Sequence, residues 1–101
     1  MDALIYKICP RGEWQAALDD GVYRGSEVDR RDGFIHFSSA MQVEETLRRH
    51  FAGQRDLLVI GVGQASLGAA LRFEVSRGGE TFPHLYGELR VSLACDVREV
   101  R

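Results

Sequence analysis

The second half of the sequence holds a succession of strand patterns with no helical pattern between them. Leu57–Ile60 is a continuous apolar run, typical of a strand that is covered on both faces. Leu71–Val75 alternates apolar and charged residues, and a longer alternation from Leu89 to Val97 predicts one long strand with a single apolar face. Because a doubly wound parallel sheet needs a helix after each strand, this cluster of strands argues against that fold and favours a largely antiparallel sheet.

The first half of the chain predicts a strand followed by a helix. Leu4–Cys9 is rich in strand formers, and the proline after it can occupy the first turn of a helix. Gly21 is a plausible end for that helix. The helix would be held to the core by residues at helical spacing, namely Trp14, Ala17 and Leu18.

A second helix is predicted from Ser39, where Ser39 and Gln42 fit a capping box and Gly53 supplies the stop. Its buried stripe consists of Ala40, Val43, Leu47 and Phe51. The charged residues 25–33 before it are predicted to form a turn region. We therefore predict an α+β fold with two helices packed on a largely antiparallel sheet, and residues 1–101 as a single domain.

Composition and charge exclude several classes of partner. The chain has 101 residues and a formal net charge of -2, and its basic residues are scattered, so nothing favours binding to nucleic acid or to a membrane surface. No apolar stretch reaches the length of a membrane span, and no signal peptide is visible. Cys9 and Cys95 both lie in apolar strand-like contexts, which predicts two buried thiols and a reducing, cytoplasmic location.

His36 and Ser38 are the first candidates for a functional site. In the stretch Asp32–Ser39 a strand-like alternation places Phe34, His36 and Ser38 on one face, at the end of a strand that leads into a helix. An imidazole beside a hydroxyl can bind a ligand. Alternatively, His36 is a buried histidine bonded to a neighbouring backbone group. A serine hydrolase is not indicated, because the chain has no G-x-S-x-G motif.

His84 and Tyr86 form the second candidate pair. They are two residues apart, so on a strand they share a face, and they follow the loop Arg77–Gly79. Such a loop beside an imidazole and a phenol could close over a small molecule. The alternative is that Tyr86 simply packs. No histidine or cysteine pair has a recognised ligand spacing, so no metal site is predicted.

Five phrases of the sequence resemble one small bacterial family. They are I-Y-K-I, W-x-x-A-x-x-x-G-x-Y-x-G-S, D-G-F-I-H-F-S-S, L-R-F-E and F-P-H-L-Y-G, and they extend over nearly the whole chain. The family is known as domain of unknown function 952. It is similar in fold to the ADP-ribosyltransferase superfamily, whose enzymes bind NAD in the cleft of a split sheet, so the resemblance implies such a split sheet here.

The resemblance also implies positions for a ligand site. Lys7 stands where those enzymes carry a ribose-binding histidine, and His36 stands at the position of a tyrosine that stacks on nicotinamide. His84 lies near the position of their glutamate, whose negative charge a histidine does not supply. Together with Ser38 and Arg77, these residues would line one positive cleft suited to a phosphate or a nucleotide, with NAD as one implied ligand.

The first hypothesis is an ADP-ribosyltransferase-like enzyme or a relative that binds nucleotides or phosphates. His36 and His84 would be its catalytic residues, and its ligand would be a small anion. The ligand-binding residues would be Lys7, Ser38, Gln42, Arg77 and Tyr86. The alternative is a non-catalytic domain that binds a metabolite or a protein, and a third hypothesis makes the histidines purely structural. The sequence leaves the oligomeric state open.

Overall fold

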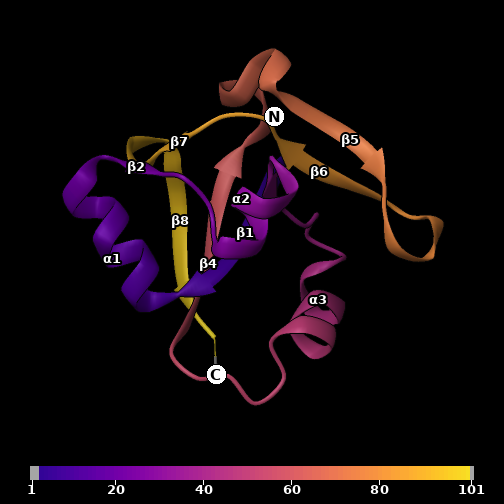
Figure 1. Cartoon of the computed structure of the whole chain (residues 1–101), viewed down its shortest axis with the longest axis horizontal. Coiled ribbons are helices and arrows are strands. Elements are labelled where there is room, and N and C mark those ends of the chain that lie inside the picture. The colour runs from indigo at the N-terminus through magenta and orange to yellow at the C-terminus, as the bar shows by residue number, and fades with distance from the viewer. Residues whose placement is uncertain (1–2, 101) are drawn as a thin grey trace.

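Two antiparallel sheets of three strands each organise the computed structural model, which describes residues 3–100 except for the side chain of Arg77. In the first sheet, β4 (Leu57–Gly63) lies between β1 (Leu4–Pro10) and β8 (Ala94–Glu99). In the second, β6 (Thr81–Leu85) lies between β3 (Ile35–His36) and β5 (Leu71–Val75). A two-stranded ribbon pairs β2 (Val22–Tyr23) with β7 (Leu89–Arg90). The predicted α+β fold with antiparallel sheets is confirmed (Figure 1).

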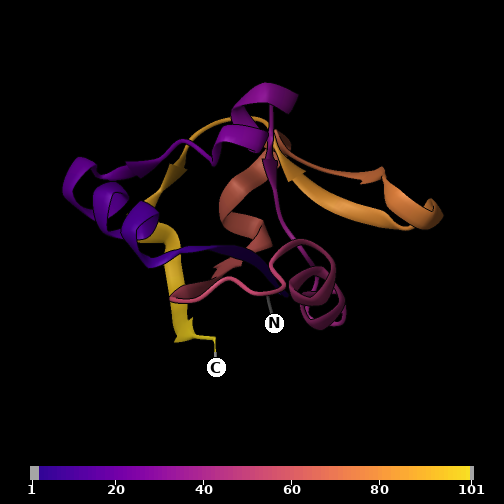
Figure 2. The same cartoon turned by 60° about the horizontal axis from the view of Figure 1, so that its bottom comes forward.

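The two sheets meet where the chain leaves β3. Tyr6 and Ser38 exchange backbone hydrogen bonds of 2.8 Å in both directions, which ties this segment to β1. One residue earlier, the amide of Phe37 donates to the carbonyl of Pro83 on β6 at 2.9 Å. The segment 37–38 therefore bridges the two sheets, while the β5–β6 hairpin extends away from the first sheet (Figures 1 and 2).

Helix α1 (Arg11–Asp20) forms as its local sequence predicts. It begins directly after Pro10 and ends at Gly21, which has the left-handed φ of 91° that favours glycine. Trp14 and Ala17 are buried, whereas Leu18 is half exposed because it lies on the margin of the buried stripe. The prediction of a helix anchored by Trp14 is confirmed.

The predicted turn region 25–33 contains a helix, α2 (Glu27–Asp32), and the prediction there was wrong. Ser26 caps this helix by accepting from the Asp29 amide, and the Asp29 side chain accepts from the Ser26 amide. Such a reciprocal cap satisfies two amides that would otherwise lack partners. The sequence did not predict this short helix, because its residues are mostly charged and form no apolar stripe at helical spacing.

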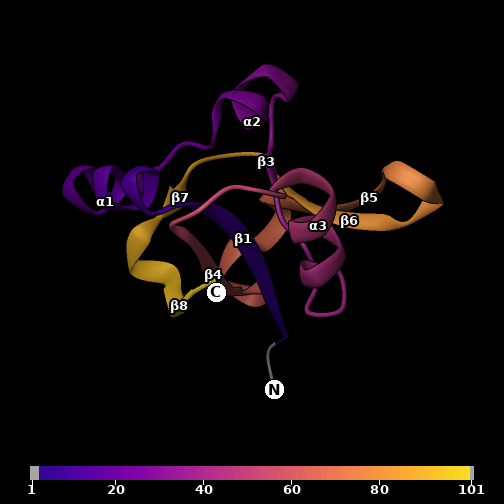
Figure 3. The same ribbon diagram turned by 90° about the horizontal axis from the view of Figure 1, so that it is seen from below.

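Helix α3 (Val43–His50) begins later than Ser39, since residues 40–42 form a turn. Within that turn the Ser39 amide donates to Oε1 of Gln42 at 3.0 Å, so only half of the predicted capping box is present. Ala40 is exposed, contrary to its predicted place in the buried stripe. The rest of the stripe packs against Ile8, Leu57 and Val59, which places α3 beside the first sheet through Val43, Leu47 and Phe51 (Figure 3).

The core lies on both faces of β4, as the apolar run Leu57–Ile60 predicts. Leu58, Ile60 and Val62 enter the larger cluster together with Trp14 of α1. Leu57 and Val59 enter the smaller cluster under α3. All seven residues of β4 are buried, and the strand continues beyond the predicted apolar run to Gly63.

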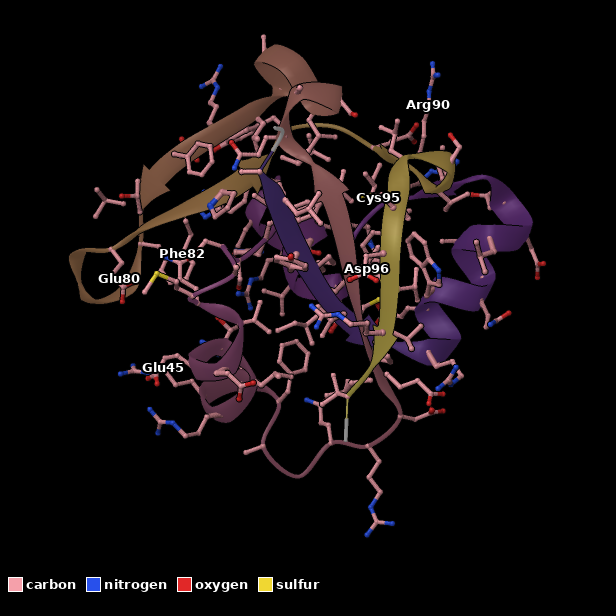
Figure 4. The ribbon with its side chains drawn as sticks, turned by 180° about the vertical axis from the view of Figure 1, so that it is seen from behind. Glu45, Glu80, Phe82, Arg90, Cys95 and Asp96 are labelled. Carbon is pink, nitrogen blue, oxygen red and sulfur yellow. The ribbon has the colours of Figure 1, made fainter. Side chains whose placement is uncertain are left out.

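The long strand predicted from Leu89 to Val97 is instead broken into three parts. β7 ends at Arg90, the 3-10 segment η3 (Val91–Leu93) follows, and β8 begins at Ala94 in the other sheet. Because the chain changes sheets, its apolar alternation does not stay on one face, and Val97 is 48% exposed. Cys95, which lies on β8 (Figure 4), is also exposed, so of the two thiols that the sequence predicts to be buried only Cys9 is.

The remaining 3-10 segments, η1 (Gln64–Ala70) and η2 (Arg77–Gly79), flank β5. Phe73 and Val75 are 50% and 72% exposed, whereas the side of the strand that carries Arg72 and Glu74 meets aromatic side chains of the second sheet. In the part of the chain that the structure describes, no helix is long and apolar enough to span a membrane.

Candidate functional site

Three basic side chains form a row across the second sheet. His36 on β3 is the register partner of His84 on β6, and His84 is in turn the partner of Arg72 on β5. Directly paired residues share a face in an antiparallel sheet, so the three side chains stand in line. The two imidazole rings are 5.5 Å apart between centroids, with their planes at 70°.

Aromatic rings surround this row. Phe34 stacks on His84 with centroids 4.0 Å apart and planes at 23°. It also contacts His36 at 4.6 Å and Tyr86 at 5.2 Å. We call this surface the histidine face and define it by Phe34, His36, Arg72, Glu74, His84 and Tyr86.

Asp29 of α2 holds His36 in place. The buried carboxylate accepts at Oδ1 from the amide of His36 at 3.1 Å and lies 2.6 Å from His36 Nδ1. At Oδ2 it accepts from Lys7 Nζ at 2.7 Å and from the Ser26 amide at 2.9 Å. His36 Nε2 lies 3.1 Å from Asp32 Oδ2, so a doubly protonated ring donates to two carboxylates at once.

The environment of Asp29 keeps it ionised. Burial by itself would raise the pKa of Asp29, but the hydrogen bond from His36 and the charge and hydrogen bond of Lys7 outweigh burial and lower that pKa well below its usual range. Gly25 permits this packing, because its φ is +100° and a Cβ there would lie 2.7 Å from the Asp29 Cβ. The Lys7–Asp29–His36 network therefore joins β1, α2 and β3.

Glu74 holds the second imidazole. Its Oε1 lies 2.8 Å from His84 Nδ1 and accepts a hydrogen bond of 2.8 Å from the Tyr86 hydroxyl. These two bonds lower the pKa of Glu74, and the bond to Glu74 raises the pKa of Tyr86. In the neutral ring, this geometry places the proton on Nδ1 of His84 and leaves Nε2 as the acceptor. The Arg72 guanidinium lies 5.1 Å from the centroid of the Tyr86 ring.

Of the predicted site residues, the structure places His36 and His84 in direct contact and joins Tyr86 to them through Phe34 and Glu74. Lys7 reaches them through Asp29 and also donates to the His36 carbonyl at 3.1 Å, but it is only 6% exposed. Its charge is therefore already paired rather than presented to a ligand. Whether these residues bind a ligand or catalyse a reaction stays a prediction.

The other predicted residues are engaged beside the histidine face. Ser38 is buried, with its hydroxyl 3.1 Å from that of Thr46 on α3. Gln42 donates to the Thr81 carbonyl at 2.9 Å and so ties the turn before α3 to β6. The side chain of Arg77 lies outside the part of the chain that the structure describes.

Sequence reasoning gave no site role to Phe34 and Asp29, and it left open whether Arg72 and Glu74 are an exposed pair or face the site. Phe34 was detectable, because it shares the alternation of His36. The spacing of Ser26 and Asp29 is that of a capping box and was also available as a signal. The direction in which Arg72 and Glu74 face depends on strand pairing, which their own alternation does not specify.

Two hollows in the described part of the chain lie away from the histidine face. One lies between α1 and β8, where Trp14 and Val91 are among its lining residues. The other lies between α1 and α2, near Tyr23 and Arg30. The expected ligand cleft is therefore not shown, and the histidine face is a surface on a sheet. Among the described residues, no group of three or more His, Cys, Asp or Glu side chains is arranged to hold a metal ion.

Comparisons with known proteins agree with this fold. The model of the family described as protein of unknown function (DUF952) matches residues 8–97. The crystal structure of protein CC0527 from Caulobacter crescentus is 46% identical over 97% of this chain and 86% of that chain, with a TM-score of 0.94. The solution NMR structure of CC0527 is also 46% identical, over 96% of this chain and 84% of that one, with a TM-score of 0.86. No match was found among curated proteins.

Proposed function

Because the chain belongs to the DUF952 family, whose description assigns no activity, we propose from the histidine face itself that the protein binds a small anionic ligand of the nucleotide class. The family resemblance predicted from the sequence is confirmed. The likeness to ADP-ribosyltransferases is not shown by the comparisons, and it enters here only as part of the proposal.

The observation that carries the proposal is the row of His36, His84 and Arg72 with aromatic rings beside it. A nucleotide combines a flat base with a phosphate, and it needs both a stacking surface and a cationic donor. Tyr86 is 39% exposed and its hydroxyl is fixed by Glu74, so its ring is a preorganised stacking surface.

Arg72 would supply the phosphate contact. Its guanidinium lies over the Tyr86 ring, where its planar fork can meet two phosphate oxygens. The side chain of His36 is 35% exposed at the other end of the row, and because both of its ring nitrogens already face Asp29 and Asp32, it would offer the ligand its ring face rather than a hydrogen bond. Lys7 and Asp29, which are buried, would act on the ligand only by holding His36 in position.

ADP-ribosyl chemistry is a finer version of the same proposal. In such a reaction the bond between nicotinamide and ribose C1′ of NAD breaks, and nicotinamide leaves with the electron pair. Water then bonds to C1′ and gives its proton to an imidazole. Glu74, hydrogen bonded to His84, would supply the negative charge that stabilises the cationic ribose and that His84 lacks.

Ligand titration tests the binding proposal. NAD, ADP-ribose, AMP and inorganic phosphate would each be added to the protein while the melting temperature and the heat of binding are followed. We expect at least one nucleotide to raise the melting temperature, because a ligand at 100 times its Kd stabilises by about 2.7 kcal/mol. If none of the four does so, the proposal is wrong.

A matched pair of variants locates the binding. Arg98 lies 5.7 Å from the Tyr6 ring on the other sheet, so Arg98→Ala removes a similar cation–ring contact away from the histidine face. We expect Arg72→Ala to weaken nucleotide binding about tenfold through the lost charge-assisted hydrogen bonds, and Arg98→Ala to leave it unchanged. Equal effects of both substitutions would refute this location for the ligand.

Release of nicotinamide from NAD tests the finer proposal. We expect release to stop in Glu74→Gln while NAD still binds. Binding without release would rule out the transfer and leave the non-catalytic alternative, in which the same surface holds a metabolite. A protein that folds but binds none of the four ligands would leave a protein partner as the remaining candidate.

A further inference from the structure

The free edge of β5 is a feature of the surface that the histidine face does not explain. Among the described strands, β5 pairs only with β6, and it lies on the hairpin that extends from the body of the molecule (Figures 1 and 2). Phe73 and Val75 on this strand are 50% and 72% exposed. An edge strand with exposed apolar residues is a template for pairing with another strand.

The ladder between β5 and β6 shows which backbone groups face this edge. The Tyr86 amide donates to the Ala70 carbonyl, and the Ser76 amide donates to the Glu80 carbonyl, both at 2.8 Å. Hydrogen-bonded pairs alternate with non-bonded pairs in an antiparallel ladder, so Arg72 and Glu74 also bond to β6. The amides and carbonyls of the residues between them therefore point away from β6.

Two further details agree with this assignment of which β5 residues bond to β6 and which face the free edge. Phe73 is paired with Pro83, which has no amide hydrogen to donate, so this position does not need a bond between β5 and β6. The Leu71 amide donates to the Gly68 carbonyl. The free edge thus presents the amides of Phe73 and Val75 and the carbonyls of Leu71, Phe73 and Val75.

We propose that this edge pairs with the same edge of a second copy of the chain, antiparallel and centred on Phe73. In that register the two Phe73 residues exchange two hydrogen bonds. Val75 of each copy donates to the Leu71 carbonyl of the other, which adds two more. The two β3-β6-β5 sheets then join into one continuous sheet.

Charge complementarity selects this register and this partner. With Phe73 opposite Phe73, Arg72 of each copy lies opposite Glu74 of the other. These are non-hydrogen-bonded positions, at which side chains of facing strands approach most closely. Opposite charges at directly paired positions stabilise a sheet, and Leu71 and Val75 form apolar pairs on the other face. A one-residue shift would abolish all of these matches.

The contrast with β8 supports the choice of edge. β8 is also an edge strand, but its ladder contains a register shift, and its exposed positions include Arg98 and Glu99. Bulges and charges of this kind protect an edge from pairing. β5 has no proline, lysine or register shift in its pairing.

The arrangement has a consequence for the histidine face. A two-fold axis perpendicular to the joined sheet leaves both histidine faces on the same side. Arg72 of one copy would then lie beside Glu74 of the other, the carboxylate that already bonds to His84 and Tyr86. Each copy would thus supply a cation at the margin of the site of the other.

Sedimentation velocity with charge-reversal variants tests the pairing. We expect the wild-type protein to sediment as a dimer, with twice the chain mass of 11.3 kDa. We expect R72E and E74R each to raise the Kd of the dimer about tenfold, because each substitution places like charges opposite each other in both of the symmetry-related pairs. The double variant R72E/E74R restores opposite charges across the symmetric pair, and we expect it to restore the dimer. Rescue distinguishes charge pairing from the loss of contacts within each copy.

A backbone variant tests the edge independently. Val75→Pro removes an edge amide that the fold itself does not use, and Val75→Ala is its matched control for the lost side chain. We expect Val75→Pro to dissociate the dimer more than Val75→Ala, with circular dichroism showing that both remain folded. If Val75→Pro does not fold, the charge-reversal set decides alone.

Three results would overturn the proposal. The first is a wild-type protein that stays monomeric at concentrations up to about 1 mM, which would put the Kd of any dimer above that concentration. The second is a dimer that R72E and E74R leave unchanged. The third is a folded double variant that does not recover the dimer. Ligand binding is measured separately on the wild-type protein, because Arg72 and Glu74 also belong to the histidine face.

Discussion

Replacing Asp29 by asparagine tests whether the Lys7–Asp29–His36 network stabilises the fold. The substitution keeps the shape of the side chain but removes the negative charge beside Lys7. The two side chains are 2% and 7% exposed, so the lysine would be left as a buried charge without a counter-ion. In asparagine an NH2 group replaces one of the two carboxylate oxygens, Oδ1 or Oδ2. Because the groups around Asp29 are themselves donors, the NH2 group would lose one or two of the four contacts that the carboxylate makes.

Removing one partner of a buried ion pair costs about 3–5 kcal/mol. The lower end applies here, because Lys7 Nζ keeps the His36 carbonyl as an acceptor at 3.1 Å. We therefore expect Asp29→Asn to lower the free energy of unfolding at pH 7 by about 3 kcal/mol. That is a large share of the roughly 5–15 kcal/mol of a typical domain, so the measurement needs the full urea transition.

Urea denaturation followed by the fluorescence of buried Trp14 measures this change. Asp96→Asn is the matched control, because the Arg98–Asp96 pair is exposed and should contribute at most about 1 kcal/mol. The double variant Lys7→Met/Asp29→Asn removes the stranded charge and should recover part of the loss. A cost below about 1 kcal/mol for Asp29→Asn, or no recovery in the double variant, would refute the reasoning.

Two further predictions follow from the perturbed pKa values. Because the pKa of Asp29 is lowered in the folded state, its contribution to stability is present above the unfolded value of about 3.9 and is lost as the pH falls towards the folded value. Urea transitions between pH 5 and pH 2 should therefore show a weaker acid dependence in Asp29→Asn than in the parent, and equal slopes would contradict this. Burial raises the pKa of Cys9 to about 12, whereas Cys95 is exposed, so iodoacetamide at pH 8 should alkylate Cys95 in the folded protein and Cys9 only after unfolding. Mass spectrometry of the two peptides measures this, and rapid labelling of Cys9 would show that the core opens.

Elements with a strong local pattern were predictable from the sequence. The first strand, the helix that ends at Gly21 and the buried strand from Leu57 were each identified by residues adjacent in the chain. Helix α2 was missed because its only signal is a reciprocal cap between Ser26 and Asp29. The strand predicted from Leu89 was wrong because a break at η3 moves the chain from one sheet to another, and alternation does not report which sheet a residue enters.

In the candidate site, too, local sequence patterns predicted some residues and only tertiary packing revealed the others. His36, His84 and Tyr86 were identified from the sequence, since alternation places polar residues on a strand face whatever the strand pairs with. Their partners Asp29 and Glu74 were not identified as such, because each lies on a different element and meets its histidine only through packing. Lys7 was assigned to the right neighbourhood, but only the structure shows its charge paired with Asp29.

The sequence by itself determined the antiparallel α+β class, the buried central strand and the residues able to carry chemistry. These depend on local periodicity, which a chain has before it folds. The tertiary structure alone decided that Arg72, His84 and His36 stand in one row, that Phe73 faces solvent, and that Asp29 lies between Lys7 and His36. These depend on strand register and on which elements meet, and burial of the core as a whole selects both.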